Sequence, residues 1–415
     1  MRLTDHEDAI LAGSFGAPRR RALQQQMMVG RFFDAGDFVE IAQVHLMADT
    51  ESLGEAGVAW LEELAGFPEE ERRVRVPTVT DPRGIDFDAY KRLNQLESWA
   101  ALERRAIDAF VAMGLLMTDT CINYQTIMPP ACREHIAFGD TGSTIYANSV
   151  LGARSNFEGG PAALAAALTG RTPRYGCHLD RGRRGTHRFV VKDRPRTLSD
   201  WGALGGVVGR ATGSYWTVPV LEGIDGTPTS DELKHFGAAL ASYGSVPLFH
   251  MIGVTPEARA LGDVFDGKIP DPETVTRADM DAFYEGFGLH ENGVDVVVFA
   301  APQQSLVEMQ QIARLLQGRT VSSGTTLIAA TSPEVKSACD RMGITATIEA
   351  AGGIVLKGVC FYQMYARETG EANGWKRLLT NSAKLVNIIA GYGYEPVLAP
   401  LERCIDAACA GRMAK

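Results

Sequence analysis

The chain has 415 residues, of which 45% are hydrophobic, and its formal net charge is −9 at pH 7. A chain of this length fills more than one hydrophobic core, so two or three domains are expected. Acidic and basic residues are interspersed, which excludes nucleic acid and anionic membranes as expected partners. No apolar segment follows the N-terminal charges and no run of about 18 apolar residues occurs, so a cytoplasmic protein without membrane spans is predicted.

Apolar periodicity predicts helices and strands that alternate along the first half of the chain. The expected elements are a helix capped by Thr4, a helix over 19–33 behind Pro18, a strand over 38–46, a helix over 54–64, a strand over 73–79 and a helix over 88–113. Repeated βα units predict sheets with helices on their faces, so the expected fold class is α/β.

The second half of the chain repeats this alternation. The expected elements are a strand over 245–252, a helix over 277–286, a strand over 294–300, a helix over 305–316, a strand over 325–330, a helix over 333–342 and a strand over 353–359. The Gly-rich segment 201–213 is the expected junction between domains, and it lacks the GxGxxG that indicates a dinucleotide site. We therefore expect three α/β domains, over 1–195, 196–320 and 321–415.

The basic cluster over 181–188 is interpreted as a solvated loop, since short charge runs usually lie on the surface. The seven cysteines contain no CxxC pair, which argues against a disulfide framework and against a zinc ribbon. Most of them are expected to be buried thiols.

Ligands of open α/β sheets bind beyond the carboxyl ends of the strands. This rule selects His45 with Asp49, the loop that carries Cys121, the loop over 301–305 and the loop that carries Cys360. These positions follow from the predicted strands alone.

The segment 148–161 gathers small, polar and charged residues ahead of a predicted helix over 161–168. Its backbone N–H groups and Arg154 are suited to an anionic group, because a helix N-terminus favours negative charge and a guanidinium grips a carboxylate with two hydrogen bonds. The alternative is that the glycines form a tight turn and that Arg154 makes an internal ion pair. Both interpretations stay open at this point.

This segment, NSVLGARSNFEGGP, resembles the NSVLGARTNREGGP signature of aconitase X proteins, and Gly170-Arg171-Thr172 follows it as in that family. Further similar motifs are Leu11–Gly13, Thr118–Tyr124, Gly253–Ala258 and Thr380–Lys384, so the resemblance covers nearly the whole chain. It implies stacked α/β/α domains of the aconitase-like fold without the swivelling small domain. A separate small subunit that carries this domain, in a heterodimer, is then the expected partner.

The resemblance implies a hydro-lyase that dehydrates, or isomerises, a small β-hydroxy acid or a hydroxy amino acid such as a hydroxyproline. A base must remove a weakly acidic α-proton while a Lewis acid polarises the leaving hydroxyl. In the superfamily the Lewis acid is an iron of an iron–sulfur cluster held by three cysteines. Two of these ligands are implied by motif, Cys121 and Cys360.

The third cysteine motif of the family, Gly-Cys-Pro-His-x-Ser, reads Ala300-Ala301-Pro302-Gln303-Gln304-Ser305 in this chain. Ala301 therefore replaces the third ligand, and Cys177 is a candidate substitute. Three alternatives remain open: an enzyme that keeps a cluster, an enzyme without one that uses a divalent metal or acid/base residues alone, and a non-catalytic binding paralogue. The candidate ligands for another metal are His45, His135, Asp140, Glu158 and His178.

The expected catalytic residues are Ser382 and Lys384, for substrate contact or proton handling, and His45, to orient the leaving hydroxyl. The expected contacts of the carboxylate substrate are Asn148, Ser149, Arg154, Ser155, Asn156, Glu158, Thr380 and Asn381. The alternative for Ser382 is the N-cap of the helix that follows it. Phe157 and the segment 139–142 also depart from the family motifs, which favours altered chemistry or an altered substrate.

Overall fold

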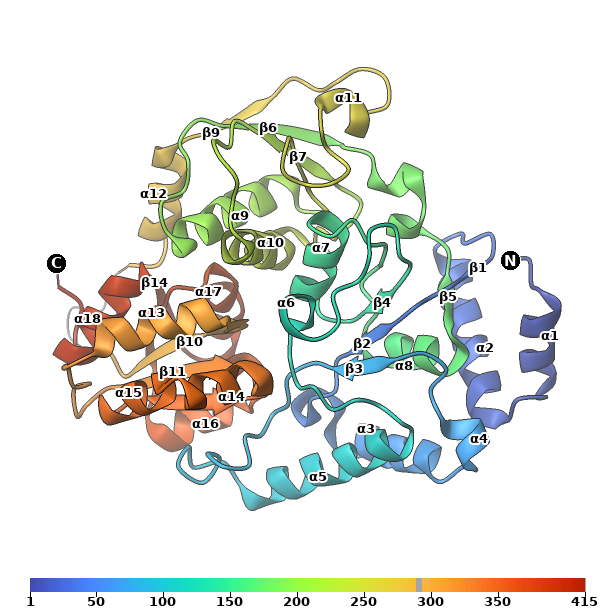
Figure 1. The fold of residues 1–415 in the computed structure, drawn as a ribbon, viewed down its shortest axis with the longest axis horizontal. Coiled ribbons are helices and arrows are strands. Elements are labelled where there is room, and N and C mark those ends of the chain that lie inside the picture. Colours follow the sequence, from blue (N-terminus) through green and yellow to red (C-terminus); the bar gives the residue numbers. More distant parts are fainter. Residues whose placement is uncertain (289–292, 415) are drawn as a thin grey trace.

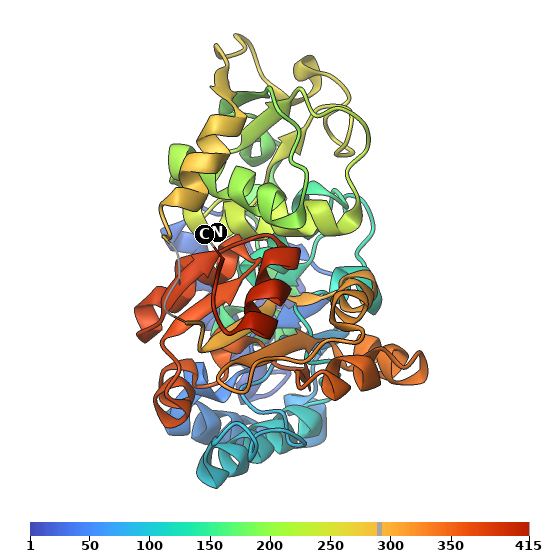
Figure 2. The same cartoon turned by 90° about the vertical axis from the view of Figure 1, so that its left-hand side faces the viewer.

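The computed structural model describes residues 1–288 and 293–414, which form three lobes in chain order around a centre where α6 and α7 lie (Figure 1). Each lobe contains a parallel sheet flanked by helices, which confirms the predicted α/β class. The view turned by 90° shows the second lobe at one end of the molecule, above the third (Figure 2). Within the described residues, no helix is long and apolar enough to cross a membrane.

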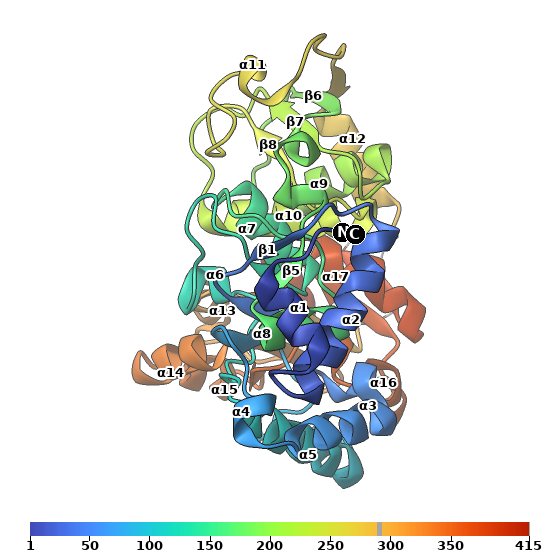
Figure 3. The same cartoon turned by 90° about the vertical axis from the view of Figure 1, so that its right-hand side faces the viewer.

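The first lobe is built on the three-stranded parallel sheet β3-β2-β4, beside the antiparallel pair β1-β5. Its strands are β1 (Phe38–Glu40), β2 (Val44–Leu46), β3 (Thr78–Thr80), β4 (Ala137–Phe138) and β5 (Arg171–Pro173). Its helices are α1 (Asp5–Ala12), α2 (Ala17–Phe32), α3 (Thr50–Ala65), α4 (Glu69–Arg72), α5 (Glu97–Ala112), α6 (Asn123–Thr126), α7 (Thr141–Ser149) and α8 (Gly160–Thr169). Helices α1 and α2 lie on the outside of this lobe (Figure 3).

Three predicted elements of this lobe are wrong in extent. The strand expected over 73–79 is β3, which covers only Thr78–Thr80. The single strand expected over 38–46 is two strands in different sheets, because Phe38–Glu40 pairs with β5 and Val44–Leu46 pairs with β3 and β4. The helix expected over 88–113 begins only at Glu97. Asn94 has a left-handed φ of 55°, a conformation that interrupts a right-handed helix and that Asn adopts more easily than most residues.

The second lobe contains the four-stranded parallel sheet β8-β7-β6-β9. Its strands are β6 (His187–Val191), β7 (Pro219–Glu222), β8 (His250–Met251) and β9 (Glu273–Val275), and its helices are α9 (Leu198–Thr212), α10 (Ser230–Gly244), α11 (Leu261–Val264) and α12 (Arg277–Glu285). Two short 3-10 turns precede it, η1 (Gly176–His178) and η2 (Asp180–Arg183). Helix α10 packs against α9, α7 and α17, so it joins the three lobes.

The Gly-rich segment 201–213 is not a junction, because nearly all of it belongs to helix α9, which Thr197 caps. Two of its glycines, Gly205 and Gly209, form the contact with α10. A Cβ added at Gly205 would lie 2.3 Å from the backbone oxygen of Phe236, and one at Gly209 would lie 2.9 Å from Tyr243 Cβ. The absence of side chains therefore permits close helix packing, which composition alone did not distinguish from a flexible turn.

Gly205→Ala tests this contact. We expect the substitution to lower stability by about 2 kcal/mol, because overpacking against backbone outweighs the gain in helix propensity. The matched control is Gly262→Ala on α11, where nothing lies within 4 Å of an added Cβ. Thermal unfolding of both variants measures the effect, and equal melting temperatures would contradict the packing explanation.

The third lobe contains the five-stranded parallel sheet β12-β11-β10-β13-β14. Its strands are β10 (Val296–Gln304), β11 (Thr326–Thr331), β12 (Ile354–Lys357), β13 (Arg377–Thr380) and β14 (Glu395–Leu398). Its helices are α13 (Leu306–Leu316), α14 (Pro333–Arg341), α15 (Ile344–Ala350), α16 (Ala366–Asn373), α17 (Ala383–Ile389) and α18 (Leu401–Ala410), with the 3-10 turns η3 (Phe361–Gln363) and η4 (Ala390–Tyr392).

The position of strand β10 within its sheet explains why its sequence is apolar throughout, with no alternation of apolar and polar residues. Val296 and Val298 belong to one hydrophobic cluster, whereas Val297 and Phe299 belong to another. Successive side chains of a strand point to opposite faces, so both faces of this sheet are covered. The elements predicted from 277 to 359 are confirmed, with bounds that differ by a few residues.

Candidate active site

Buried polar side chains meet at the carboxyl ends of β2, β3 and β4. His45 lies in β2, Asp81 directly follows β3, and Asp140 follows β4 by two residues. The three strands are parallel, with His45 opposite Val79 in β3 and Phe138 in β4, so these ends share one edge of the sheet. His45, Asp81 and Asp140 are each at most 3% exposed. We call them, together with Lys384, the catalytic cluster, after the role that is predicted for His45 and Lys384.

Lys384 reaches this edge from α17, in the third lobe. Its Nζ donates to Asp140 Oδ1 at 3.1 Å, and Asp140 Oδ2 accepts from the backbone N–H of Ser143 at 2.7 Å to cap α7. Burial opposes both charges, yet the pairing lowers the pKa of Asp140 and raises the pKa of Lys384. The pair is therefore ionised at neutral pH.

Burial favours the neutral forms of the other two members of the cluster. Burial, with the charge of Asp140, raises the pKa of Asp81 well above its ordinary value, and burial lowers the pKa of His45. His45 Nε2 donates to the carbonyl of Thr120 at 2.8 Å, so in the neutral ring Nδ1 carries the lone pair. That Nδ1 has no hydrogen-bond partner among the described residues. A buried acid and a neutral imidazole are thus placed beside an ammonium–carboxylate pair.

Gln363 fixes the carboxyl groups around His45. Its Nε2 donates to Asp49 Oδ2 at 3.3 Å and to Asp81 Oδ2 at 3.2 Å. Asp49 also caps α3 through Ser52, and burial raises its pKa. The first and third lobes therefore share this hydrogen-bond network.

Cys121 and Cys360 are both buried beside the cluster, on loops that Gln303 ties together. The backbone N–H of Gln303 donates to Cys121 Sγ at 3.4 Å. Its side-chain amide donates to the carbonyls of Asp119 at 3.1 Å and Val359 at 3.3 Å. Gln303, which stands where the family motif has His, thus makes structural contacts to both cysteine loops.

Ala301 precedes Gln303 by two residues near the carboxyl end of β10, in a left-handed conformation with φ 56°. Its carbonyl accepts from Ser382 Oγ at 2.6 Å, and Ser382 Oγ accepts from the backbone N–H of Leu385 at 3.1 Å. Ser382 is therefore the N-cap of α17, the alternative left open by the sequence. Its catalytic role stays a prediction.

The residues present do not fit an iron–sulfur cluster held by three thiolates. The third position is the methyl group of Ala301, which has no donor atom. Cys177, the candidate substitute, packs instead with Val218 and Leu248 in a separate apolar cluster. Across residues 1–288 and 293–414, no group of three or more His, Cys, Asp or Glu side chains has a geometry that holds a metal ion.

The segment 148–158 forms an internal brace. Asn148 and Ser155 exchange hydrogen bonds of 2.8 Å, and Ser149 Oγ accepts from the backbone N–H of Phe249 at 2.9 Å. Asn156 Oδ1 accepts from Tyr215 Oη at 2.7 Å. These polar groups hold the first and second lobes together, and their predicted contacts with substrate stay predictions.

Arg154 and Glu158 lie at opposite ends of this brace. The parallel bridges His135↔Arg154 and Phe138↔Phe157 show that the segment runs alongside β4. Arg154 is therefore at the amino end of β4, and the catalytic cluster is at the carboxyl end. The guanidinium of Arg154 pairs with Asp180 and donates to the carbonyl of His178 at 3.2 Å, which matches the ion-pair alternative.

Glu158, at the other end, accepts from Thr172 Oγ1 at 2.6 Å, and burial raises its pKa. This hydrogen bond is internal to the first lobe. Thr380 Oγ1 accepts from the backbone N–H of Ser382 at 3.1 Å, whereas Asn381 faces a separate cavity. Substrate contacts of these three residues stay predictions.

The interpretation of 181–188 as a solvated loop is wrong for Arg183. Its side chain is 3% exposed and pairs with Glu257 at 2.7 Å, while Nη2 also donates to the carbonyl of Asn148. A buried guanidinium is stable here because a carboxylate and backbone carbonyls occupy its donors.

Sequence reasoning missed Asp81, Gln363 and Tyr362, whose ring centroid lies 5.7 Å from Lys384 Nζ. Asp81 directly follows β3, so the carboxyl-end rule would have found it had that strand been placed correctly. Gln363 and Tyr362 carried no comparable signal, since they lie in a 3-10 turn beyond the Cys360 loop.

Comparison with known proteins gives three consecutive matches. The chain matches the family models described as aconitase X first domain over residues 1–181, second domain over 185–285 and third domain over 294–410. The chain belongs to the aconitase X family. The predicted membership is thereby confirmed, while the predicted division at 195 and 320 stays a prediction.

Relatives in the aconitase X family carry two kinds of name. The phosphomevalonate dehydratase large subunit of Methanothermobacter thermautotrophicus is 34% identical over 386 residues, which cover 93% of each chain. The cis-3-hydroxy-L-proline dehydratase of Pseudomonas aeruginosa is 32% identical over 421 residues, which cover 99% of this chain and 70% of the relative. A crystal structure of Thermococcus kodakaraensis aconitase X in its holo form superposes with a TM-score of 0.87 at 31% identity, over 98% of this chain and all of that one. The aconitase-like fold is confirmed.

A buried carboxyl near the catalytic cluster is expected to make the free energy of unfolding depend on pH. Glu103, on α5, accepts from Thr50 Oγ1 at 2.6 Å, and burial raises its pKa to about 7. The folded state therefore holds this proton more tightly than the unfolded state, so the stabilisation is full below pH 4.5 and is lost as pH rises to about 7. Over this pH range we expect Glu103 to lower the free energy of unfolding of the wild type by about 3 kcal/mol, and we expect this contribution to be absent from Glu103→Gln.

Melting temperatures at pH 5 and pH 8 measure the Glu103 effect. The wild type should lose more stability between the two pH values than Glu103→Gln does. The matched control is Glu349→Gln, which changes an exposed carboxylate and should follow the wild type. Parallel curves for wild type and Glu103→Gln would show that Glu103 ionises as an ordinary carboxyl.

Proposed function

We propose that this chain is a hydro-lyase that dehydrates, or isomerises, a small β-hydroxy acid or hydroxy amino acid. The single observation that carries the proposal is the catalytic cluster, a buried ammonium–carboxylate pair beside a neutral imidazole and a carboxyl of raised pKa. Relatives that share its family are named dehydratases, which supports the same reaction class. Pairs of titratable groups with opposed pKa shifts are typical of acid–base catalysis.

Each group of the cluster has a role in this proposal. The ammonium of Lys384 stabilises the negative charge that builds on the substrate carboxylate as the α-proton leaves, and Asp140 keeps that ammonium charged and in place. His45 Nδ1 accepts the α-proton, since its lone pair has no other partner among the described residues. Asp81, whose raised pKa favours the protonated form, delivers its proton to the departing hydroxyl. The net reaction releases one water and forms one carbon–carbon double bond.

We further propose that this enzyme does not use an iron–sulfur cluster held by three cysteine thiolates. Ala301, which has no donor atom, and the structural contacts of Gln303 support a site that works without that cluster. The enzyme would then use acid–base residues alone or a bound divalent metal. The names of several relatives include the words large subunit. We therefore infer that a separate small subunit completes the active site in a heterodimer, and a cytoplasmic location stays a prediction.

Turnover of a defined substrate panel tests the function. The anaerobically purified chain, with and without its co-expressed small subunit, is incubated with cis-3-hydroxy-L-proline, mevalonate 5-phosphate and simple β-hydroxy acids. Loss of water is followed by proton NMR. Product from at least one substrate is expected. Turnover that persists after chelation would indicate acid–base residues alone, and turnover that is lost and then restored by a divalent metal other than iron would indicate the metal-dependent form. Binding without turnover across the panel would instead support a non-catalytic paralogue.

A further inference from the structure

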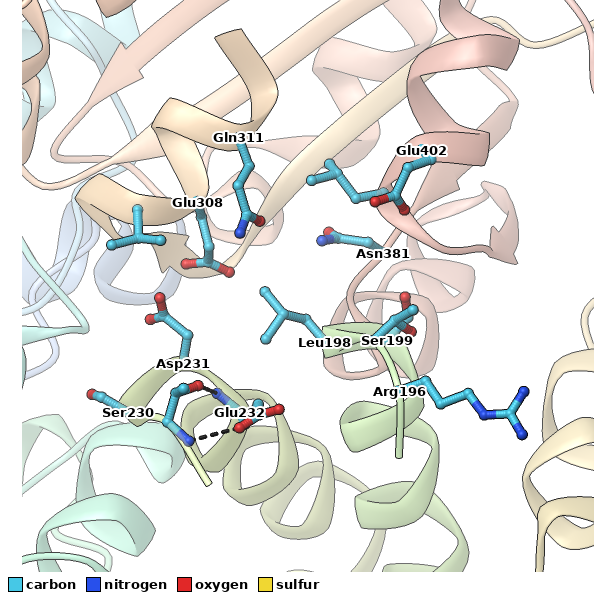
Figure 4. Close-up of a pocket in the computed structure, with 14 residues that line it drawn as sticks. Arg196, Leu198, Ser199, Ser230, Asp231, Glu232, Glu308, Gln311, Asn381 and Glu402 are labelled. Atoms are coloured by element: carbon cyan, nitrogen blue, oxygen red, sulfur yellow. Dashed lines mark hydrogen bonds between the residues drawn. The ribbon is translucent and has the colours of Figure 1, made fainter. Parts of the chain in front are cut away.

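Two lysines are almost fully buried where the lobes meet, and they differ in how many of their hydrogen-bond donors are used. The side chain of Lys234, on α10, is 0% exposed. Its acceptors are the carbonyl of Gln303 at 3.2 Å, Asp231 at 3.2 Å and Glu308. Figure 4 shows Asp231 and Glu308 facing each other at the cavity between the second and third lobes. An ammonium carries three donors, so the ammonium of Lys234 is satisfied.

Lys384 lacks such a set of acceptors. Its Nζ donates to Asp140 Oδ1 at 3.1 Å and to no second acceptor within residues 1–288 and 293–414. The ring of Tyr362, with its centroid 5.7 Å from Nζ, attracts the charge, but Tyr362 accepts no hydrogen bond from it. The Lys384 side chain is 4% exposed, so it retains some accessible surface. Buried donors without acceptors are unfavourable, so two N–H groups of Lys384 remain for an acceptor that a ligand supplies.

The first turn of α7 supplies free backbone donors beside this ammonium. Helix α7 has nine residues and Asp140 as its N-cap. Asp140 Oδ2 accepts from the backbone N–H of Ser143, whereas the N–H groups of Thr141 and Gly142 have no acceptor in the part of the chain that the structure describes. The positive end of the helix dipole adds to the charge of Lys384. Together these donors favour an anionic group.

Gly142 leaves room for such a group next to the ion pair. A Cβ added at Gly142 would lie 3.0 Å from Asp140 Oδ2, 3.6 Å from Lys384 Nζ and 3.9 Å from Ala238 Cβ. The space that a side chain would occupy therefore adjoins the ammonium. An oxygen atom placed in that space is close to hydrogen-bonding distance of Nζ. A side chain at position 142 would take the place of this oxygen.

We propose that the substrate carboxylate is anchored by the two free donors of Lys384 and the backbone N–H groups of Thr141 and Gly142. Gly142 determines specificity, because any side chain there competes with the carboxylate for space. This inference rests on the proposed hydro-lyase function and deepens it by adding residues of α7 to the site. Asp140 holds the parts of the anchor together, since it caps α7 and bonds to Lys384. Arg154, the guanidinium first expected to bind the carboxylate, lies at the amino end of β4.

Calorimetric titration of the full chain with cyclopentanecarboxylate tests the anchor, because this probe has no hydroxyl to eliminate and reports binding without turnover. Cyclopentanecarboxamide is the uncharged probe of the same shape. We expect the carboxylate to bind at least about tenfold more tightly than the amide. Gly142→Ala should remove most of this preference. The control is Gly262→Ala on α11, where nothing lies within 4 Å of an added Cβ, and it should bind as the wild type does.

Nuclear magnetic resonance of the chain with isotope-labelled glycine gives a second readout. The amide resonance of Gly142 is assigned from its absence in Gly142→Ala. It should move downfield when the carboxylate binds and stay in place with the amide, because only the carboxylate accepts a strong hydrogen bond from this N–H. A purely structural role of Gly142 would not produce this difference between the two probes.

Equal affinity of the wild type for the two probes would overturn the anchor, and so would no binding of the carboxylate up to millimolar concentrations. An unchanged preference in Gly142→Ala that is folded by circular dichroism would also contradict it. If Gly142→Ala does not fold, the comparison of the two probes on the wild type decides. The hydro-lyase function fails separately, when the carboxylate binds with the expected preference but no member of the substrate panel is turned over.

Discussion

Asp140→Asn is expected to lower turnover by about a hundredfold or more and to cost about 3–5 kcal/mol of stability. The reason is that Asp140 is the carboxylate bonded to Lys384 Nζ, in a place where both side chains are at most 4% exposed. Its removal leaves a buried ammonium without a counter-charge. Steady-state kinetics on a substrate that the panel shows to be turned over, together with urea unfolding, measure the two effects.

A double variant separates catalysis from stability at this pair. Asp140→Asn combined with Lys384→Met removes both charges, so it should regain much of the lost stability while turnover stays absent. The control is Arg21→Met, which breaks an exposed ion pair with Glu63 and should cost less than about 1 kcal/mol. Recovery of turnover in the double variant would show that the pair is only structural.

Ala301→Cys combined with Gln303→His is expected to change the cofactor content of the protein. The wild type, purified anaerobically, should contain little iron or sulfide, because Cys121 and Cys360 supply only two of the three thiolates that such a cluster requires. The double variant adds a thiol beside Cys360 and removes the amide that ties the two cysteine loops. Iron and sulfide analysis, with absorption between about 320 and 450 nm from sulfide-to-iron charge transfer, measures the gain.

Cys121→Ser in that engineered background provides the matched control, since it removes one of the three thiols and should abolish the gained iron. Stoichiometric iron and sulfide in the unmodified chain would contradict the expectation. It would mean that this family member completes a cluster with a ligand that lies outside the three cysteine motifs.

Sequence reasoning predicted the parts of the fold in which local pattern and burial agree. The run Val296–Ala300 is apolar throughout because both faces of its sheet are covered, and the helices after it begin at Ser or Pro residues that start helices in general. The Gly-rich helix α9 was missed because glycine signals a turn unless a neighbouring helix requires its small size. That neighbour, α10, is known only from the tertiary structure.

The candidate site was predictable where position along a strand decides it. His45 was selected by the carboxyl-end rule and Lys384 by its motif, and the structure brings them to one edge with Asp140. A motif does not state where a side chain points, however. Arg154 is in the most specific segment of the sequence, yet its guanidinium lies at the amino end of β4 with Asp180.

The bond between Lys384 and Asp140 joins residues 244 positions apart in the chain. During synthesis on a ribosome, the first lobe emerges long before α17 does. The carboxylate of Asp140 therefore stays hydrated or protonated until the 244 residues that separate it from Lys384 have been translated. A nascent or truncated chain that lacks α17 cannot assemble this edge in its charged form, so the proposed capacity for catalysis arises only after α17 has been made.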